Sequence, residues 1–356
     1  MSKREKQAIG QQILTAFRAA GAEEVAPDLL LPAETLLDLY GEDIRARAYV
    51  TQDPIRGEVM LRPDFTVPVV QMHMQNGAEP ARYCYLGEVF RKQDQGETQP
   101  EHPRDNEYLQ AGFELFARDP DADAEVFALF HAILAPLNLR ATMGDMDVLM
   151  DAVRALPLSG ARRAALLHHI WRPRRFARLL ARFASGDAAP RNFSDAAGPW
   201  TGLRSRDEMQ ARIDRLQADA AELPLAQVWV ARLERLFAID APAPQALSQL
   251  RALAAEIPDI AEAVDRLERN LALLAARGID VAAIRFDASH GRHTMEYYDG
   301  MTFSFTAEGR ADWPPVATGG RYDALAAVLG QAQGRSIPAV GGIIRPGLVY
   351  ELGGIA

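Results

Sequence analysis

The chain has 356 residues, of which 48% are hydrophobic and 24% charged, and this composition is typical of a folded globular protein. Its length allows two domains, or one domain with an insertion. The formal net charge of -9 argues against a large phosphate-binding surface, so we expect no nucleic-acid partner, although a local basic patch remains compatible with it. The single cysteine, Cys84, excludes an intrachain disulfide and favours a reducing compartment. We find no signal-peptide core and no membrane-length apolar run, so we expect a cytoplasmic protein without a membrane partner.

The N-terminal part of the chain predicts two helices and a pair of short strands. Apolar residues at helical spacing precede Gly21, and a second short helix is expected near Leu36. Short strands at 48–51 and 59–61 flank a turn that contains Pro and Gly. Asp64 follows at a position where it could cap a helix that runs to residue 77.

A predicted β-hairpin is the most informative feature of the sequence. Residues 82–91 and 107–116 each alternate like a strand, and the polar segment between them is typical of a loop. The hairpin would hold Arg91, Gln110 and Glu114 on one rigid surface. This mixture of a long cation, an amide and a carboxylate suits the binding of a small charged molecule, although a solvated sheet face or a structural ion cluster remains the alternative.

The rest of the chain predicts a core that is interrupted by helices. A helix capped by Asp119 follows the hairpin, and a strand and another helix come after it. Residues 159–278 are rich in Ala, Leu, Arg and Glu and predict a helical insertion between core segments 1–158 and 279–356. Strand patterns then return and include Tyr298.

The C-terminal segment adds a glycine pair and one more strand. Gly319 and Gly320 predict a turn that leads into a helix, and a strand is expected at 337–344.

Two further patterns in the sequence favour structural roles over binding roles. Basic and aromatic residues interleave at 171–178, as in some RNA-binding segments, but their spacing favours an arginine-decorated helix with a buried stripe. His168 and His169 are adjacent, so their side chains diverge on a helix and form a poor metal pair. No Cys/His ligand spacing, Gly-x-Ser-x-Gly elbow or Gly-Lys-Ser/Thr phosphate loop is present, so we expect no metal or cofactor.

Five segments resemble elements of histidyl-tRNA synthetases, and they occur in the same order as in that family. Residues 61–66, Leu-Arg-Pro-Asp-Phe-Thr, resemble the family's Leu-Arg-Pro-Glu-Gly-Thr element. The hairpin is similar to class II motif 2, residues 296–298 and 318–323 to the family's Asp-Tyr-Tyr and Gly-Gly-Arg-Tyr-Asp elements, and residues 338–341 to the start of motif 3. The resemblance implies an α+β fold with a class II synthetase-like core, in which helices flank a mostly antiparallel sheet, and a helical insertion.

The sequence departs from this family at the residues that serve ATP. The family's catalytic arginine falls on His293, and the motif 3 arginine falls on Leu348 in an ungapped comparison. Arg292 and Arg345 lie nearby, so a local shift could restore one guanidinium. The sequence also ends directly after motif 3, where a synthetase would continue into an anticodon-binding domain.

This combination resembles the regulatory subunits of ATP phosphoribosyltransferase, which are paralogues of histidyl-tRNA synthetase in histidine biosynthesis. The resemblance implies a non-catalytic subunit that activates a short catalytic partner and conveys feedback inhibition by L-histidine. It also implies a homodimer within a hetero-octamer. Two rivals stay open: a ligase that forms histidyl-adenylate without an anticodon domain, and a metabolite-binding adaptor for an unrelated protein.

The resemblance also implies a histidine pocket. The α-amino group would contact a carboxylate, a hydroxyl and an amide, and the imidazole would lie between an acid and a phenol. Two glycines would let the backbone approach the ligand, and an arginine would be the cation for its carboxylate. The residues implied for the amino group are Asp64, Thr66 and Gln110, and those for the imidazole are Glu114 and Tyr298. The two glycines are Gly319 and Gly320, and the arginine is Arg91.

Overall fold

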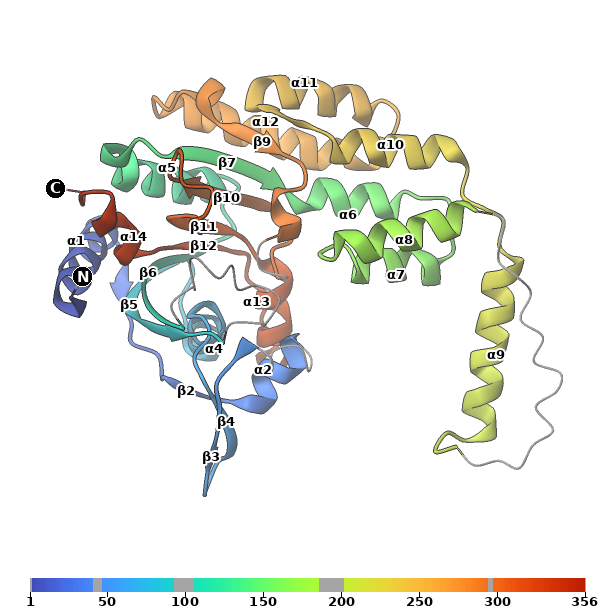
Figure 1. The fold of residues 1–356 in the computed structure, drawn as a ribbon, viewed down its shortest axis with the longest axis horizontal. Helices are drawn as coiled ribbons and strands as arrows, with labels where there is room; N and C mark the ends of the chain where they lie inside the picture. The colour runs from blue at the N-terminus through green and yellow to red at the C-terminus, as the bar shows by residue number, and fades with distance from the viewer. Residues whose placement is uncertain (1, 41–46, 93–105, 186–201, 294–296, 356) are drawn as a thin grey trace.

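A computed structural model describes residues 2–40, 47–92, 106–185, 202–293 and 297–355. Its centre is a nine-stranded sheet in the order β1-β5-β6-β12-β11-β10-β7-β9-β8 (Figure 1). All neighbouring strands are antiparallel except the pairs β1–β5 and β7–β9. The strands are β1 (Glu23–Glu24), β5 (Ala81–Phe90), β6 (Glu107–Phe116), β7 (Arg140–Asp145), β8 (Asp240–Pro242), β9 (Arg285–Asp287), β10 (Met301–Thr306), β11 (Ala317–Arg321) and β12 (Ala339–Ile344). Helices flank this mostly antiparallel sheet, which confirms the predicted fold class.

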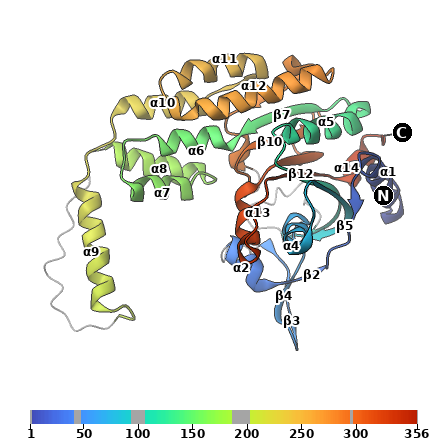
Figure 2. The same cartoon turned by 180° about the vertical axis from the view of Figure 1, so that it is seen from behind.

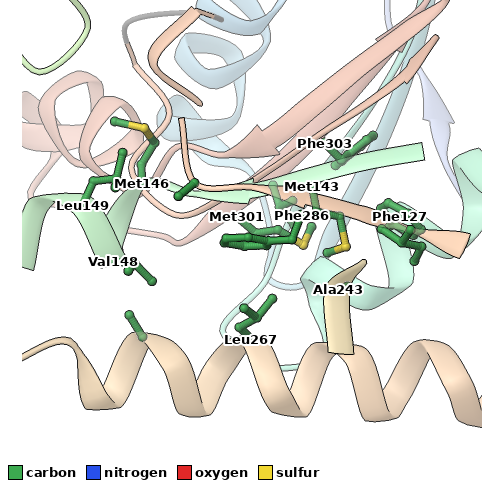
Figure 3. Packing of buried hydrophobic residues seen from close by; sticks show 14 of the residues in the cluster. Phe127, Met143, Met146, Val148, Leu149, Ala243, Leu267, Phe286, Met301 and Phe303 are labelled. Atoms are coloured by element: carbon green, nitrogen blue, oxygen red, sulfur yellow. The ribbon is translucent and has the colours of Figure 1, made fainter. Parts of the chain in front are cut away.

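One face of the sheet carries the main hydrophobic core. Helices α1 (Lys3–Ala19), α5 (Ala122–Leu134) and α12 (Ala261–Ala276) contribute their apolar stripes to it. Figure 3 shows Leu267 of α12 pointing toward Met143, Phe286 and Met301 on the strands. Helix α14 (Pro346–Glu351) packs on α1, so the two chain ends lie together (Figure 2).

The other face of the sheet is covered by fewer elements. Helices α4 (Thr66–Asn76) and α13 (Asp323–Gly330) lie over it, next to a small sheet in the order β2-β4-β3 (Figure 1). The small sheet is built from β2 (Leu30–Pro32), β3 (Val50–Asp53) and β4 (Gly57–Leu61), and α2 (Ala33–Tyr40) packs against it. These elements enclose the face on which the predicted site residues lie.

The region of the predicted insertion is helical but is joined to the core. After α6 (Met146–Arg154) it contains α7 (Gly160–His168), α8 (Pro173–Ala184), α9 (Arg206–Ala221), α10 (Gln227–Phe237), α11 (Ala243–Ala254) and α12. Strand β8 was not predicted, and it extends the large sheet by pairing with β9. Asn270 of α12 donates a hydrogen bond to the buried carboxylate of Asp123 over 3.4 Å. The second half of this region therefore shares the main core, while α9 projects from the body (Figure 1).

Three local predictions were wrong. Asp119 was predicted to cap a helix, but helix α5 begins at Ala122, two residues later than such a cap would place it. The Asp119 carboxylate instead accepts a hydrogen bond from the N–H of Asp121, in a turn that precedes the helix. Tyr298 lies in an irregular segment before β10 and not in a strand. Gly319 and Gly320 belong to β11 and do not form a turn. The loop at 93–105 and residue Glu296 lie outside the described residues.

Candidate ligand site

Residues on the less covered face of the sheet form a row across its middle strands. Thr302, Gly320, Gly341 and Glu114 are directly opposite one another on β10, β11, β12 and β6. Side chains in register on neighbouring strands point to the same face. A Cβ at Gly341 would lie 1.7 Å from Glu114 Oε2, so only glycine leaves room for this carboxylate. The row thus combines an acid with an open backbone surface.

The carboxylate of Glu114 is the centre of the site. It is 1% exposed and accepts hydrogen bonds from Tyr322 Oη over 2.6 Å, Tyr85 Oη over 2.9 Å and Thr66 Oγ1 over 3.1 Å. Burial raises the pKa of Glu114 to about 7, the three hydroxyl donors oppose this rise, and the charge of Asp64 adds to it. A carboxylate has about four lone-pair positions, so three donors leave about one for a ligand N–H.

A stack of side chains holds Tyr85 in place. The Phe65 ring lies parallel to the Tyr85 ring with centroids 4.2 Å apart, and the Arg62 guanidinium lies 3.7 Å from the Phe65 centroid. Arg62 is fixed in turn by hydrogen bonds from Nη1 to the Pro27 carbonyl over 2.7 Å and from Nη2 to the Glu88 carbonyl over 2.9 Å. The orientation of a Glu114 donor therefore depends on packing that extends to the N-terminal segment.

The residues expected around an amino group lie beside Glu114. Asp64 is 5% exposed, and its Oδ1 accepts from the N–H of Val67 over 3.3 Å, so it also caps the start of α4. Thr66 bonds Glu114 directly. Gln110 is 3% exposed, and its side-chain oxygen is buried and has no hydrogen-bond partner among the described residues. A buried acceptor without a donor is costly, so this oxygen is suited to a ligand N–H.

The structure separates the two predicted glycines. A Cβ at Gly320 would lie 2.8 Å from the Tyr298 ring, on the same face as Glu114. A Cβ at Gly319 would lie 2.3 Å from the Phe303 ring, which belongs to the core on the opposite face. Burial raises the pKa of Tyr298, and the charges of Glu114 and Asp64 raise it further. Gly320 and Tyr298 therefore belong to the site, whereas Gly319 provides close packing behind it.

Arg91 lies at the edge of the site, directly after β5. Its Nε donates to the carbonyl of Pro63 over 2.8 Å, which ties the hairpin to the segment that carries Asp64. Its side chain is half-buried.

The two arginines that could have restored an ATP site have partners within the protein. Arg292 is 7% exposed and donates from Nε to the Ile170 carbonyl over 2.8 Å. Its guanidinium contacts the rings of Phe176 and Phe237, which also contact each other. Arg345 donates from Nη1 to the carbonyl of Pro315. Leu348 of α14 packs against the main core. The side chain of His293 lies outside the described residues.

Three contributors to the site were missed in the sequence. Tyr85 and Tyr322 both donate to Glu114, and Phe65 supports Tyr85. The available signal was the position of Tyr85, which lies on the same strand face as the other site residues, and the tyrosine of the Gly-Gly-Arg-Tyr-Asp element. Within the described ranges, no group of three or more His, Cys, Asp or Glu side chains is placed to hold a metal ion. None of the described helices is long and apolar enough to cross a membrane.

A buried acid on a glycine-rich face of a mostly antiparallel sheet places the chain in the class II synthetase-like fold. The sequence model of the family described as histidyl-tRNA synthetase matches residues 1–345. An ATP phosphoribosyltransferase regulatory subunit/histidyl-tRNA synthetase from Bacillus halodurans superimposes with a TM-score of 0.71 at 20% identity, covering 98% of this chain and 79% of that one. A histidyl-tRNA synthetase from Nostoc sp. PCC 7120 gives 0.66 at 17% identity, covering 98% and 72%.

Curated relatives narrow the class. The chain is 32% identical to an ATP phosphoribosyltransferase regulatory subunit from Rhizobium leguminosarum, over 92% of this chain and 93% of the relative. It is also 32% identical to one from Mesorhizobium japonicum, over 94% of each chain. The chain belongs to the family of ATP phosphoribosyltransferase regulatory subunits, which confirms the predicted resemblance.

Proposed function

We propose that this chain is the non-catalytic, activating subunit of a cytoplasmic ATP phosphoribosyltransferase and that the Glu114 site binds L-histidine as a feedback inhibitor. The partner would be a short catalytic subunit that transfers the phosphoribosyl group of phosphoribosyl pyrophosphate to N1 of ATP. Family membership supports the regulatory role. The observation that carries the ligand assignment is the buried pair of acceptors, the Glu114 carboxylate and the unpartnered oxygen of Gln110.

The chemistry of histidine matches these acceptors. Its ammonium group would donate to the Gln110 oxygen and to Asp64 and Thr66, which removes the cost of a buried unpaired acceptor. One imidazole N–H would take the remaining position on Glu114, and Tyr298 would contact the other side of the ring. An amino acid without a second nitrogen donor would leave these polar groups unpaired, so the site would discriminate against it. Arg91 would pair with the ligand carboxylate.

The placement of the arginines supports the absence of catalysis. Adenylate formation needs cations that stabilise the triphosphate and the charge that develops during transfer. The guanidinium of Arg292 instead contacts two buried aromatic rings, and Leu348 occupies the position of the motif 3 arginine. We therefore expect no histidine-dependent exchange between ATP and pyrophosphate. Exchange at a rate that scales with the concentration of this chain would favour the rival ligase.

Reconstitution with the catalytic subunit tests the regulatory role. Formation of phosphoribosyl-ATP should rise when the chain is added and fall when histidine is added. Glu114→Gln should keep the activation and weaken the inhibition, because the amide keeps the size of the side chain but loses its charge. Exposed Glu262→Gln, with the same charge change, should behave as wild type. Lost activation with normal inhibition in Glu114→Gln would contradict the assignment.

Feedback also has a thermodynamic signature. Histidine can inhibit only if it binds one global state of the complex more tightly than another, and the coupling must be reciprocal. Calorimetry should therefore give a different histidine affinity with and without the substrates of the catalytic subunit. Light scattering of the mixture tests the expected hetero-octamer, and scattering of the chain alone tests the expected homodimer.

A further inference from the structure

The segment around α7 and α8 has an unusual charge distribution. Residues 152–186 contain eight arginines and two histidines but no aspartate or glutamate, although the whole chain has a net charge of -9. Burial lowers the pKa of His169, and the positive charges of His168, Arg175 and Arg172 lower it further. This segment is therefore a local basic region on an acidic protein.

Several arginines of this segment have structural partners. Arg162 is buried and pairs with Asp219 over 2.7 Å and with Glu222 over 3.3 Å, and these contacts fasten α7 to the end of α9. Arg182 also reaches Asp219, at 3.5 Å, and Arg154 pairs with Asp151 at 2.7 Å. The fold thus accounts for these charges without any external ligand.

Arg174, Arg175 and Arg178 form a different group, which we call the α8 arginine face. All three are exposed, and within the part of the chain that the structure describes their side chains make no ion pair or hydrogen bond. Their spacing of i, i+1 and i+4 places them on one side of the helix, where like charges repel one another. The fold therefore carries an unfavourable arrangement that nothing within the described chain relieves.

The α8 arginine face is presented on a rigid support. Phe176 and Phe183 of the same helix are buried at 1% and 2% exposure. Arg292 lies over the Phe176 ring and donates to the carbonyl of Ile170, which joins α8 to the segment next to β10. The three exposed arginines therefore belong to a helix whose opposite side is fixed in the core. Helix α8 lies well away from β5 and β6 (Figure 1).

The chemistry of the face favours a protein surface over a nucleic acid. Single-stranded binding sites combine basic residues with exposed aromatic rings for base stacking. Here the two phenylalanines are buried, and Trp171 is half-buried with its indole nitrogen enclosed. Duplex binders contact roughly six to ten phosphates, which is more than three arginines supply on a chain of negative net charge. Guanidinium groups pair well with carboxylates, so three of them fit a cluster of Asp and Glu side chains.

We propose that the α8 arginine face docks a carboxylate-rich patch of the catalytic subunit. This inference rests on the proposed function for the identity of the partner. Helix α8 lies apart from β6, the strand that carries Glu114 (Figure 1). Charges that steer an encounter act mainly on the association rate, and salt screens them.

Charge reversal with a matched control tests the proposal. The test variant combines Arg174→Glu, Arg175→Glu and Arg178→Glu. The control variant makes the same net charge change at three other exposed arginines whose side chains have no described partner, on α9 and α12: Arg206→Glu, Arg212→Glu and Arg269→Glu. Circular dichroism and histidine calorimetry establish that each variant folds, and a triple Arg→Lys variant at the α8 positions keeps the charge.

The association rate with the catalytic subunit, measured at low and at physiological salt, gives the result. We expect the α8 Glu variant to associate at least roughly tenfold more slowly at low salt, with a smaller deficit as salt rises. The control and the Lys variant should stay within about twofold of wild type. If the α8 Glu variant and the control Glu variant have equal association rates and equal salt dependence, the docking surface is wrong but the proposed function is not affected. If the wild-type chain fails to bind the catalytic subunit, the proposed function is wrong as well. Binding of a labelled RNA that only the α8 Glu variant loses, with complex formation unchanged, would assign the face to RNA and overturn the inference.

Discussion

Glu114→Gln gives a prediction for the ligand-free chain that can be worked out from the site itself. Burial raises the pKa of Glu114 to about 7 from an ordinary value of 4.5, so the folded chain holds this proton over a pH range in which the unfolded chain has lost it. A group that binds a proton more tightly in the folded state makes stability fall as pH rises between these two pKa values. The contribution is therefore fully present below about pH 4.5 and is lost above about pH 7.

The size of the effect follows from the shift. Each pKa unit corresponds to about 1.4 kcal/mol, so a rise from 4.5 to about 7 corresponds to about 3 kcal/mol of stability that disappears on ionisation. Glutamine has nearly the same shape and never ionises. Its amide oxygen can accept from the phenols of Tyr85 and Tyr322, which keeps most of the packing.

Urea unfolding at a series of pH values from about 5 to 8 measures the difference. The free energy of unfolding of wild type should fall relative to that of Glu114→Gln by about 3 kcal/mol over this range. Exposed Glu262→Gln should follow the wild-type curve, because its side chain is 87% exposed. Parallel curves for wild type and Glu114→Gln would refute the argument, since they would mean that Glu114 titrates alike in the folded and unfolded chains.

Three further predictions concern packing around the site and across the core. Gly341→Ala places a Cβ against Glu114 Oε2, so it should cost about 1–3 kcal/mol in urea unfolding and abolish histidine binding in calorimetry; an unchanged affinity would contradict the geometry. Phe65→Leu removes the ring that is stacked between Tyr85 and Arg62, so it should lower the free energy of unfolding by about 1–3 kcal/mol. Tyr85→Phe keeps the stacked rings and should have a smaller effect. A larger effect for Tyr85→Phe would mean that the stack is not the support of Tyr85. Arg321→Met leaves the carboxylate of Asp123 without its cation and should cost about 3–5 kcal/mol, whereas a similar change at an exposed ion pair costs about 1 kcal/mol or less; a small loss of stability would argue against a buried pair.

The central hairpin was predictable from the sequence because its two strands alternate between polar and apolar residues. The structure pairs Ala81–Phe90 with Glu107–Phe116 in continuous antiparallel register. Alternation fixes which residues share a face, so Gln110 and Glu114 had to lie on the same side once the strand was assigned. The polar face of the site therefore follows from local periodicity alone.

Long-range contacts explain what the sequence could not provide. Tyr322 donates to Glu114 from a position 208 residues further along the chain, and no local pattern reports such a contact. The glycine pair was assigned to a turn because adjacent glycines usually mark turns. In β11 these glycines are needed for packing, since Gly319 lies against Phe303 and Gly320 against Tyr298. Glycine is favoured in a turn because of its backbone conformation and in a packed strand because it leaves space for a neighbouring side chain. Only the tertiary structure shows which of the two reasons applies.

Arg292 is held by contacts that belong to the architecture of the helical region. A guanidinium that turned toward the ligand face would lose its hydrogen bond to the Ile170 carbonyl and its contacts with two aromatic rings, each worth about 0.5–2 kcal/mol. It would also release the contact that joins α8 and α10 to the segment before β10. Recovery of a cation for ATP by a local shift would therefore weaken the support of the α8 arginine face. For this reason, the position of Arg292 favours a chain that binds a partner and a small ligand over one that activates an amino acid.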